Sequence, residues 1–314
     1  MGENDAGALR SAETCIDRFC GSLRAERNCS DHTLRAYRGD IAAFLAWCER
    51  GGYDFLSIDH RGLRLYLAEL AQARYARSTV NRILSSIRAF YRWLLVEGAI
   101  QSDPASVLQG PRQGARLPRV LRPQEMARLL GVNAVDAGEG DIGKAEAVRL
   151  RDQAILEFLY ACGARISEAS ELRNDLVDFS QCQVKVVGKG RKERIVPVHA
   201  LCLDSMMRYR RLARPVLLRG AESEFFFVST RGNQMKTDAM RKMFKQTLAQ
   251  AGLPADITPH DMRHTFATDV LAGGADLRSV QEMLGHASLS TTQIYTHLTV
   301  ERLRRAHRAA HPRS

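Results

Sequence analysis

The sequence predicts a mainly α-helical protein of two domains, the second of which contains a small antiparallel β-sheet. The chain has 314 residues, which exceeds the length of one ordinary domain. Apolar residues recur at helical spacing along most of it, and only short runs, chiefly residues 184–187 and 195–198, have the composition of strands. Between residues 8–109 and 120–314 lies a stretch rich in Gly, Pro and Arg, residues 110–119, which we interpret as a linker between two bodies that open and close.

The first domain is expected to be entirely helical. Residues 11–27 form a moderately amphipathic helix, and Ser30 or Asp31 caps a second helix that ends at Gly51. A third helix follows, and Ser78 opens a fourth. The apolar stripes of the second, third and fourth helices are Leu34, Tyr37, Ile41, Phe44 and Leu45; Leu63, Tyr66, Leu67 and Leu70; and Val80, Ile83, Leu84, Ile87 and Phe90.

The chain is strongly basic. Lys and Arg outnumber Asp and Glu by 46 to 35, a formal net charge of +11, which favours a polyanionic partner. In the first domain a single arginine is most simply a solvated surface residue, but the whole group is equally well explained as a phosphate-contacting face. These residues are Arg35, Arg38, Arg74, Arg77, Arg82, Arg88 and Arg92.

The composition argues against several classes of protein. The 7 cysteines are odd in number and scattered, without a Cys-x-x-Cys pair, which disfavours a disulfide framework or a zinc site and favours a reducing cytoplasm. No apolar run approaches the length needed to cross a membrane, and the first residues lack the basic-then-apolar pattern of a signal peptide.

The second domain combines helices with a hairpin. The two strands are joined by the turn Gly188-Lys189-Gly190-Arg191-Lys192, and residues 225–228 could add a third strand. Residues 133–143 form a loop without an assigned structure. Helices are expected at residues 123–130, 150–162 and 237–251, with a further helical turn opening at Arg165.

Two capped helix starts near the C-terminal end fix the positions of candidate site residues. Thr258 with Pro259 and Asp261 is a capped start, after which His260 and Arg263 project from one face of the helix. Asp276 caps a helix that Gly285 ends.

Further on, Ser290 with Gln293 opens another helix, in whose second turn Tyr295 lies. His286 and Tyr295 are thus close, which on its own more often indicates structure than chemistry.

A set of polar residues on separate elements gives these features a common meaning. Each has a structural explanation by itself, such as an ion pair between Arg165 and Glu168, but together they suit nucleophilic attack on a phosphodiester. Two guanidiniums clamp the phosphoryl oxygens, a neutral His accepts the phenol proton, a Lys protonates the leaving oxygen and a Tyr forms the covalent ester. No carboxylate cluster accompanies them, so no metal or other cofactor is expected. The set is Arg165, Lys189, His260, Arg263, His286 and Tyr295.

At these residues the chain resembles the tyrosine recombinases, most closely the bacterial Xer site-specific recombinases. The resemblance rests on Tyr160-Ala-Cys-Gly-Ala-Arg165-Ile-Ser-Glu168, Val187-Gly-Lys189-Gly-Arg-Lys-Glu-Arg-Ile-Val-Pro197, His260-Asp-Met-Arg263-His-Thr-Phe-Ala-Thr268 and Leu284-Gly-His286-Ala-Ser-Leu-Ser-Thr-Thr-Gln-Ile-Tyr295-Thr-His. It extends over nearly the whole chain, with residues 133–143 longer than is usual.

The resemblance implies a role for each matched residue. Tyr295 is the nucleophile that forms a 3′-phosphotyrosyl bond, and Arg165 and Arg263 hold the scissile phosphate. Lys189 is the general acid for the 5′ hydroxyl. The remaining roles are assistance in proton transfer for His260, contact with the phosphate or support of the transition state for His286, orientation of the site for Glu168, and structure for His264 and His297. Apart from the resemblance, the basic residues on the helices give candidate DNA-binding positions, although a solvated basic face explains those at 241, 242 and 245 equally well. The candidates are Arg35, Arg38, Arg77, Arg82, Arg88, Arg241, Lys242 and Lys245.

The resemblance also implies an architecture and partners. A helical core-binding domain of SAM-like fold and a catalytic domain form a C-clamp around duplex DNA, and four protomers on two sites exchange strands through a Holliday junction. The tetramer contains one recombinase or two, a DNA translocase is a possible activator, and residues 300–310 are expected to dock on a neighbouring protomer. The expected role is resolution of chromosome dimers at a dif-like site during cell division. Alternatives are a phage, plasmid or integron integrase, a type IB topoisomerase and a catalytically silent DNA-binding protein.

Overall fold

The computed structural model describes residues 11–27, 31–111, 119–134, 142–188, 193–285, 307 and 312. The chain divides into two compact units, Met1–Arg116 and Leu117–Ser314, each of which we treat by itself. In the described ranges, no helix is both long enough and apolar enough to cross a membrane.

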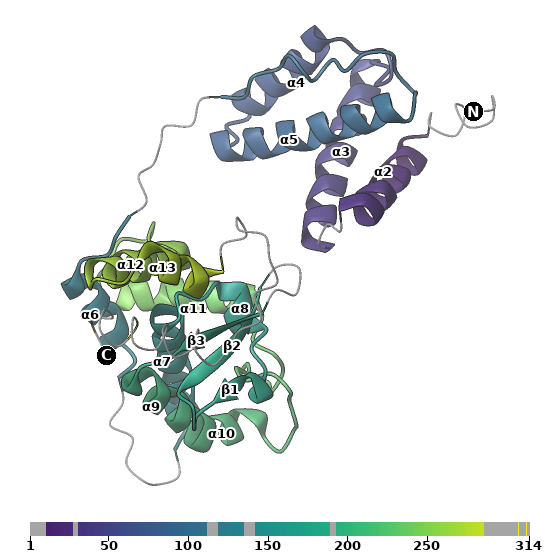
Figure 1. The fold of residues 1–314 in the computed structure, drawn as a ribbon. Coiled ribbons are helices and arrows are strands. Elements are labelled where there is room, and N and C mark those ends of the chain that lie inside the picture. Colours follow the sequence, from purple (N-terminus) through teal and green to yellow (C-terminus); the bar gives the residue numbers. More distant parts are fainter. Residues whose placement is uncertain are drawn as a thin grey trace. The chain divides into compact units, whose positions relative to one another are not determined.

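The first unit is a helical bundle, as expected from its apolar stripes. The second, third and fourth helices bury most of their stripes, with Tyr37, Leu67 and Leu70 half-buried, while the basic residues between the stripes stay at or near the surface. The last helix starts one residue before Ser78, with Ala76 as its N-cap, and Gly52 follows the second helix in the left-handed conformation, with φ of 66°. The helices are α2 (Ala12–Arg27), α3 (Asp31–Gly51), α4 (His60–Gln72) and α5 (Arg77–Val96) (Figure 1).

Aromatic rings form the centre of this bundle. Phe19 and Phe90 are fully buried and meet edge to face, with ring centroids 5.3 Å apart. Tyr91 is also fully buried, and its hydroxyl donates a hydrogen bond of 2.9 Å to the carbonyl oxygen of Phe55. The first unit therefore has a core of its own.

The second unit is built around α7 (Lys144–Ala161), which packs against both α9 and α12. From Ala154 to Ala161 its side chains are almost completely buried, so this half of the helix is enclosed on all sides rather than on one face. The other helical segments are α6 (Pro123–Gly131), α8 (Ile166–Ser170), η1 (Asn174–Leu176), α9 (Ala200–Arg208), the π-helical turn η3 (Tyr209–Ala213), α10 (Arg214–Leu218), α11 (Thr237–Gln250), α12 (Pro259–Ala272) and α13 (Leu277–Leu284).

Two of these helical regions differ from the expectation. Helix α7 begins at Lys144 rather than at Leu150, because its first turns are partly exposed and their apolar pattern is weak. The region from α9 to α10 was not predicted at all. Its buried positions, Cys202, Met206, Tyr209, Ala213 and Leu217, do follow helical spacing, but several arginines lie between them.

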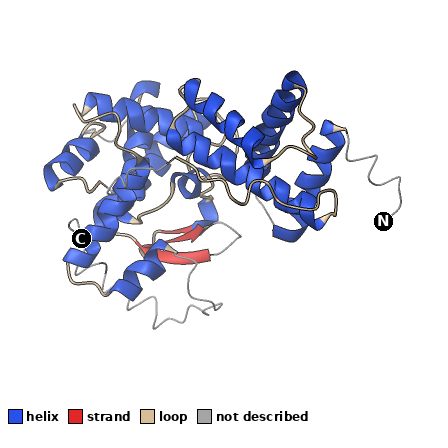
Figure 2. Cartoon of the chain, turned by 90° about the horizontal axis from the view of Figure 1, so that it is seen from above, coloured by secondary structure: helices blue, strands red, loops and turns tan. Residues whose placement is uncertain are grey.

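A three-stranded antiparallel sheet accompanies the helices, in the order β1 (Val177–Asp178), β2 (Gln183–Val187) and β3 (Glu193–Pro197). The expected hairpin is confirmed: β2 pairs with β3, and Val187 lies opposite Glu193 at the end next to the turn. Figure 2 shows the strands in red among the predominantly helical elements.

The expected strand at residues 225–228 is wrong, because the third strand is β1. Residues in this segment form only isolated bridges, from Phe225 to Arg173 and from Val228 to Gln234. The Tyr209 hydroxyl occupies the backbone groups that a strand would use, since it donates to the Phe226 oxygen at 3.0 Å and accepts from the Val228 N–H at 3.0 Å.

Candidate active site

The site begins where α7 ends. Gly163 has φ of 53°, and a Cβ there would lie 2.4 Å from the Phe266 ring, so this tight turn requires glycine. Arg165 is then the extended N-cap residue of α8. The Glu168 carboxylate, three residues on, accepts a hydrogen bond of 2.7 Å from the backbone N–H of Arg165. The spacing in the sequence therefore brings these two residues together locally.

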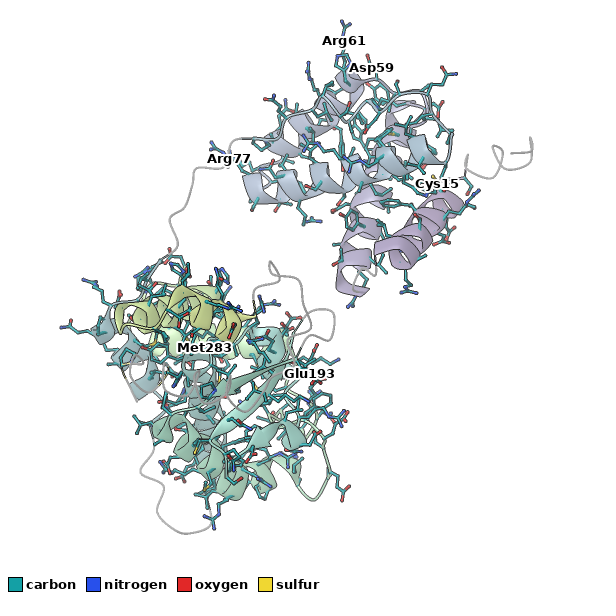
Figure 3. The ribbon with its side chains drawn as sticks, in the orientation of Figure 1. Cys15, Asp59, Arg61, Arg77, Glu193 and Met283 are labelled. Carbon is teal, nitrogen blue, oxygen red and sulfur yellow. The ribbon has the colours of Figure 1, made fainter. Side chains whose placement is uncertain are left out.

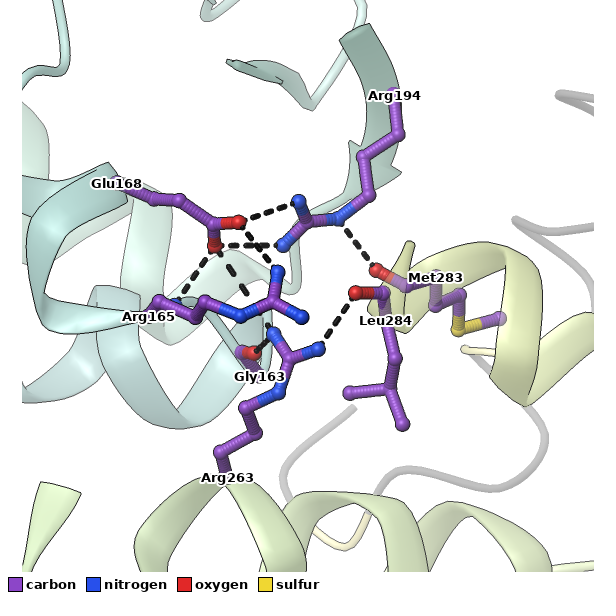
Figure 4. Close-up of polar contacts among 7 residues, drawn as sticks. All are labelled: Gly163, Arg165, Glu168, Arg194, Arg263, Met283 and Leu284. Atoms are coloured by element: carbon purple, nitrogen blue, oxygen red, sulfur yellow. Dashed lines mark hydrogen bonds and ion pairs between the residues drawn. The ribbon is translucent and has the colours of Figure 1, made fainter. Parts of the chain in front are cut away.

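Glu168 is the point at which three arginines meet (Figure 4). Its Oε1 accepts from Nη1 of Arg165 at 2.9 Å and from Nη1 of Arg194 at 2.8 Å, and its Oε2 accepts from Nη2 of Arg194 at 2.8 Å. Nη1 of Arg263 lies 3.9 Å from Oε2. Glu168 and Arg194 are both buried, whereas the Arg165 side chain is 44% exposed.

Arg263 enters this cluster from the second turn of α12. Thr258 caps that helix as expected, because its hydroxyl accepts from the backbone N–H of Asp261 at 3.3 Å. Arg263 donates from Nη1 to the Gly163 oxygen at 2.5 Å and from Nη2 to the Leu284 oxygen at 2.5 Å. One buried guanidinium thus fixes the ends of both α7 and α13.

The cluster carries a surplus of positive charge, since three guanidiniums surround one carboxylate. Burial raises the pKa of Glu168, but the hydrogen bonds and charge of Arg194 outweigh this effect and hold the pKa below its ordinary value. Burial and then the charge of Arg165 lower the pKa of Arg263 to about 10, so Arg263 is still protonated at neutral pH. An anion placed beside Arg165 would balance the excess charge.

The other predicted site residues are placed differently. His260 lies in the first turn of α12 and is exposed, and the hydrogen bonds and ion pairs of the described arginine cluster do not include it. Lys189, His286 and Tyr295 lie outside the described residues, as does the expected helix start at residues 290–293. The helix that precedes His286 is described. As expected, Asp276 caps α13, and the helix ends at Gly285, whose φ is 66°.

Arg194 was not predicted as a site residue, although it lies within the motif that contains Lys189. It occupies an inward position of β3, which alternates with exposed or half-buried positions. A charged residue at the inward position of a strand is the signal that could have revealed a buried ion pair.

Part of the His307 environment is also described. Its ring is buried, and Nε2 lies 3.0 Å from the Ala161 oxygen of the same chain. The ring stacks on His199 with centroids 6.1 Å apart. This contact is made within one chain, whereas residues 300–310 are expected to dock on a neighbour.

Several candidate DNA-binding arginines have partners within the chain. Arg38 pairs with Asp17, Arg82 pairs with Asp40, Arg88 donates to the Leu108 oxygen, and Arg241 pairs with Asp238 at 2.8 Å. Arg35 in α3 and Arg77 at the start of α5 (Figure 3) are exposed, as are Lys242 and Lys245 on α11. The exposed pairs of Arg38 and Arg241 are weak and leave these arginines able to bind a phosphate, whereas the Asp40 partner of Arg82 is buried.

Comparisons with known proteins match both units. Residues 119–302 match the model of the phage integrase family, and residues 16–98 match the phage integrase N-terminal SAM-like domain. The chain is 41% identical to tyrosine recombinase XerC of Mycobacterium sp. strain KMS, over 96% of this chain and 100% of the relative. It is 42% identical to tyrosine recombinase XerD of Pseudomonas aeruginosa, over 95% of this chain and 97% of the relative.

A solved structure agrees with these matches at the level of the fold. The crystal structure of the XerH site-specific recombinase in a post-cleavage complex with a palindromic difH substrate has a TM-score of 0.68 at 22% identity, over 94% of this chain and 84% of that one.

Together these matches define an enzyme of the class of site-specific DNA recombinases. The chain belongs to the phage integrase family and, within it, to the tyrosine recombinases. The resemblance inferred from the motifs is thereby confirmed, together with the mainly α fold and its small antiparallel sheet.

Proposed function

We propose that this chain is a site-specific recombinase that cuts and rejoins duplex DNA through a 3′-phosphotyrosyl intermediate at Tyr295. The observation that carries the proposal is the cluster of Arg165, Arg194 and Arg263 around Glu168, in which positive charge exceeds negative charge. A recombinase needs this surplus, because the transition state of phosphoryl transfer spreads negative charge over the phosphoryl oxygens.

Arg165 and Arg263 have the donors that this role requires. A guanidinium carries five N–H groups in a fixed fork. Arg263 directs one N–H at each of two backbone oxygens, so three of its five N–H groups make no hydrogen bond to the described residues. Arg165 directs one N–H from its guanidinium at Glu168, and its side chain is 44% exposed. Two forks side by side suit the bidentate capture of a phosphodiester.

In the proposed reaction one bond to phosphorus forms as another breaks, and one proton is accepted for each proton donated. The Tyr295 oxygen bonds to phosphorus as the bond from phosphorus to the 5′ oxygen breaks. The phenol proton passes to His260, and a proton from Lys189 ends on the 5′ oxygen. Attack by a 5′ hydroxyl of the exchanged strand reverses these steps. The phosphotyrosyl ester retains the bond energy, so neither a metal nor a nucleotide is required.

The two units suggest how DNA is engaged. We assign core DNA binding to residues 8–109 and catalysis to residues 120–314, joined by a linker at residues 110–119. The relatives matched over nearly their whole length are named XerC and XerD, which supports action in the cytoplasm on a dif-like site to resolve chromosome dimers before cell division.

We also propose a tetramer on two sites. Because the identities to the XerC and XerD relatives are nearly equal, we leave two compositions open: this chain forms the tetramer alone, or a second recombinase completes it. In that assembly residues 300–310 dock on a neighbouring protomer, so the His307 contact within the chain must be released. Activation by a DNA translocase is part of the same proposal.

A suicide substrate tests the chemistry. A nicked duplex carrying the candidate site is incubated with wild type, Tyr295→Phe and Tyr75→Phe in EDTA without nucleotide, with and without a second recombinase. Tyr75 is an exposed tyrosine of the first unit and serves as the matched control. We expect a covalent protein–DNA band for wild type and Tyr75→Phe and none for Tyr295→Phe. A band that persists in Tyr295→Phe, or a wild type that binds the site tightly without cleaving it, would refute the proposal.

A further inference from the structure

We propose that Arg194 is a positioning residue of this recombinase, which holds the end of the β2–β3 hairpin and the last turn of α13 against Glu168. The inference rests on the proposed function, because the positioned groups are those assigned to the reaction. It assigns a role to a residue that the catalytic set does not include.

Arg194 uses each of its three nitrogen atoms on a different acceptor atom (Figure 4). Nη1 and Nη2 donate to the two oxygens of Glu168, each at 2.8 Å, and Nε donates to the Met283 oxygen at 2.7 Å. The Arg194 side chain is 4% exposed and that of Glu168 is 2% exposed. One guanidinium therefore joins β3, α8 and α13 in a place that solvent does not reach.

The position of Arg194 in β3 matters for the hairpin. Arg194 directly follows Glu193, the first described residue after the turn. Glu193 pairs with Val187 at the end of β2. Lys189, the proposed general acid, is two residues beyond Val187 in the sequence. A bond from Arg194 to Glu168 thus fixes the strand end from which the Lys189 turn extends, relative to the arginines that hold the phosphate.

The contact with α13 is supported by a second, independent feature. The guanidinium passes beside Gly285, where a Cβ would lie 3.1 Å from Cδ of Arg194 and 3.3 Å from Nη1. Arg263 donates to the neighbouring carbonyl oxygen, that of Leu284. Two arginines therefore hold consecutive carbonyl groups at the helix end that leads into His286.

Arg194 acts through other residues rather than on the substrate. Its fork faces Glu168 and its Nε faces a backbone oxygen, so the groups that meet a phosphate are those of Arg165 and Arg263. A lysine could keep the charge beside Glu168, but one ammonium group cannot reproduce the planar fork and the third bond. Arg194→Lys therefore tests the hydrogen bonds that position the hairpin and α13 while it keeps the positive charge beside Glu168.

The test measures single-turnover cleavage on two suicide substrates, one with the normal 5′ oxygen and one with a bridging 5′ sulfur. Sulfur leaves as a thiolate, whose conjugate acid has a pKa of about 8.5 in cysteine, so it needs no general acid. The full-length variants are Arg194→Lys and Arg194→Gln. Lys189→Ala and Arg165→Ala serve as chemical references, and Arg173→Lys, at an exposed arginine that pairs with Glu224, is the matched control.

We expect both Arg194 variants to bind DNA as wild type does and to cleave the oxygen substrate roughly 10²-fold more slowly, the size of effect that a misplaced general acid produces. On the sulfur substrate they should regain most of the wild-type rate, as Lys189→Ala does, whereas Arg165→Ala should not. Arg173→Lys should match wild type on both substrates.

Three results would overturn the inference: equal losses on both substrates, full activity of Arg194→Lys on oxygen, or loss of DNA binding by both variants, which would make Arg194 a residue of the fold alone. A wild type that cleaves neither substrate, or Tyr295→Phe that cleaves both, would instead overturn the proposed function.

Discussion

Glu168 shows how one residue can serve both the fold and the site. Its carboxylate is buried, and hydrogen bonds from Arg165 and Arg194 keep it ionised. The pair with Arg194 is almost completely buried, so removal of either partner costs stability, although Arg165 still donates to Glu168 when Arg194 is replaced. Under the proposed function, the same geometry aligns Arg165 for a phosphate.

This arrangement predicts an effect of Glu168→Gln on stability and on its pH dependence. Because the folded pKa of Glu168 lies below its ordinary value of about 4.3, its contribution is complete above that pH and is lost as the pH falls through the folded pKa. Glu168→Gln should lower the free energy of unfolding at pH 7 by about 3–5 kcal/mol and should flatten its decline in acid.

Urea unfolding followed by circular dichroism between pH 3 and 7 (about the range in which Glu titrates) measures both effects. Glu224→Gln, which removes an exposed carboxylate that pairs with Arg173, is the control and should leave the stability nearly unchanged. Equal losses in the two variants at pH 7 would show that the Glu168 cluster does not stabilise the fold.

At the scale of elements, the sequence was sufficient to predict a helix where residues close in sequence complete the hydrogen bonds of its ends. Helices α12 and α13 were predictable because Thr258, Asp276 and Gly285 cap their ends with short-range hydrogen bonds and a left-handed turn. The segment at 225–228 was not, because the Tyr209 hydroxyl, distant in sequence, takes its hydrogen bonds.

The same distinction applies to the site. Arg165 and Glu168 are joined by helix-start geometry, which the sequence reveals. The ion pair of Glu168 with Arg194 spans α8 and β3, and no local pattern specifies which strand side chain reaches which helix.

The caps predict separate effects on the two units. Asp276 accepts from the Ser279 N–H at 2.9 Å in the second unit, and Asp59 accepts from the N–H groups of Arg61 and Gly62, each at 2.9 Å, in the first unit (Figure 3). Replacing either by Ala removes the hydrogen bonds of the cap, and for Asp276 this should cost about 1 kcal/mol. The melting temperature of the smaller first unit should fall by about 4–8 °C in Asp59→Ala, and that of the second by about 2–4 °C in Asp276→Ala.

Differential scanning calorimetry of the full chain resolves the two transitions and identifies which one each variant shifts. If both variants shift one common transition, the units do not unfold independently.

At the scale of the whole molecule, each unit has its own core, while the positive charge extends over both. The first core is centred on aromatic rings such as Phe19 and Phe90, and the second on the enclosed helix α7. The net charge of the chain is +11, and basic residues are exposed on both units, such as Arg35 and Arg77 on the first and Lys242 and Lys245 on the second. The charge of the entire chain therefore attracts a polyanion. The dependence of the binding constant on salt concentration distinguishes a direct phosphate contact from this general attraction.

That response gives a prediction for the exposed lysines of α11. If Lys242 and Lys245 each contact one phosphate, Lys242→Ala and Lys245→Ala should each weaken binding to the target site and to unrelated duplex alike. Each should also reduce the slope of log K against log salt by about 0.9, the release of counterions at one phosphate. Lys144→Ala removes the same charge from an exposed position at the start of α7 and should leave the slope unchanged. Equilibrium binding titrations across salt concentrations measure the slopes. A Lys144→Ala slope that falls as much as the other two would mean that overall charge, and not contact by α11, governs the attraction.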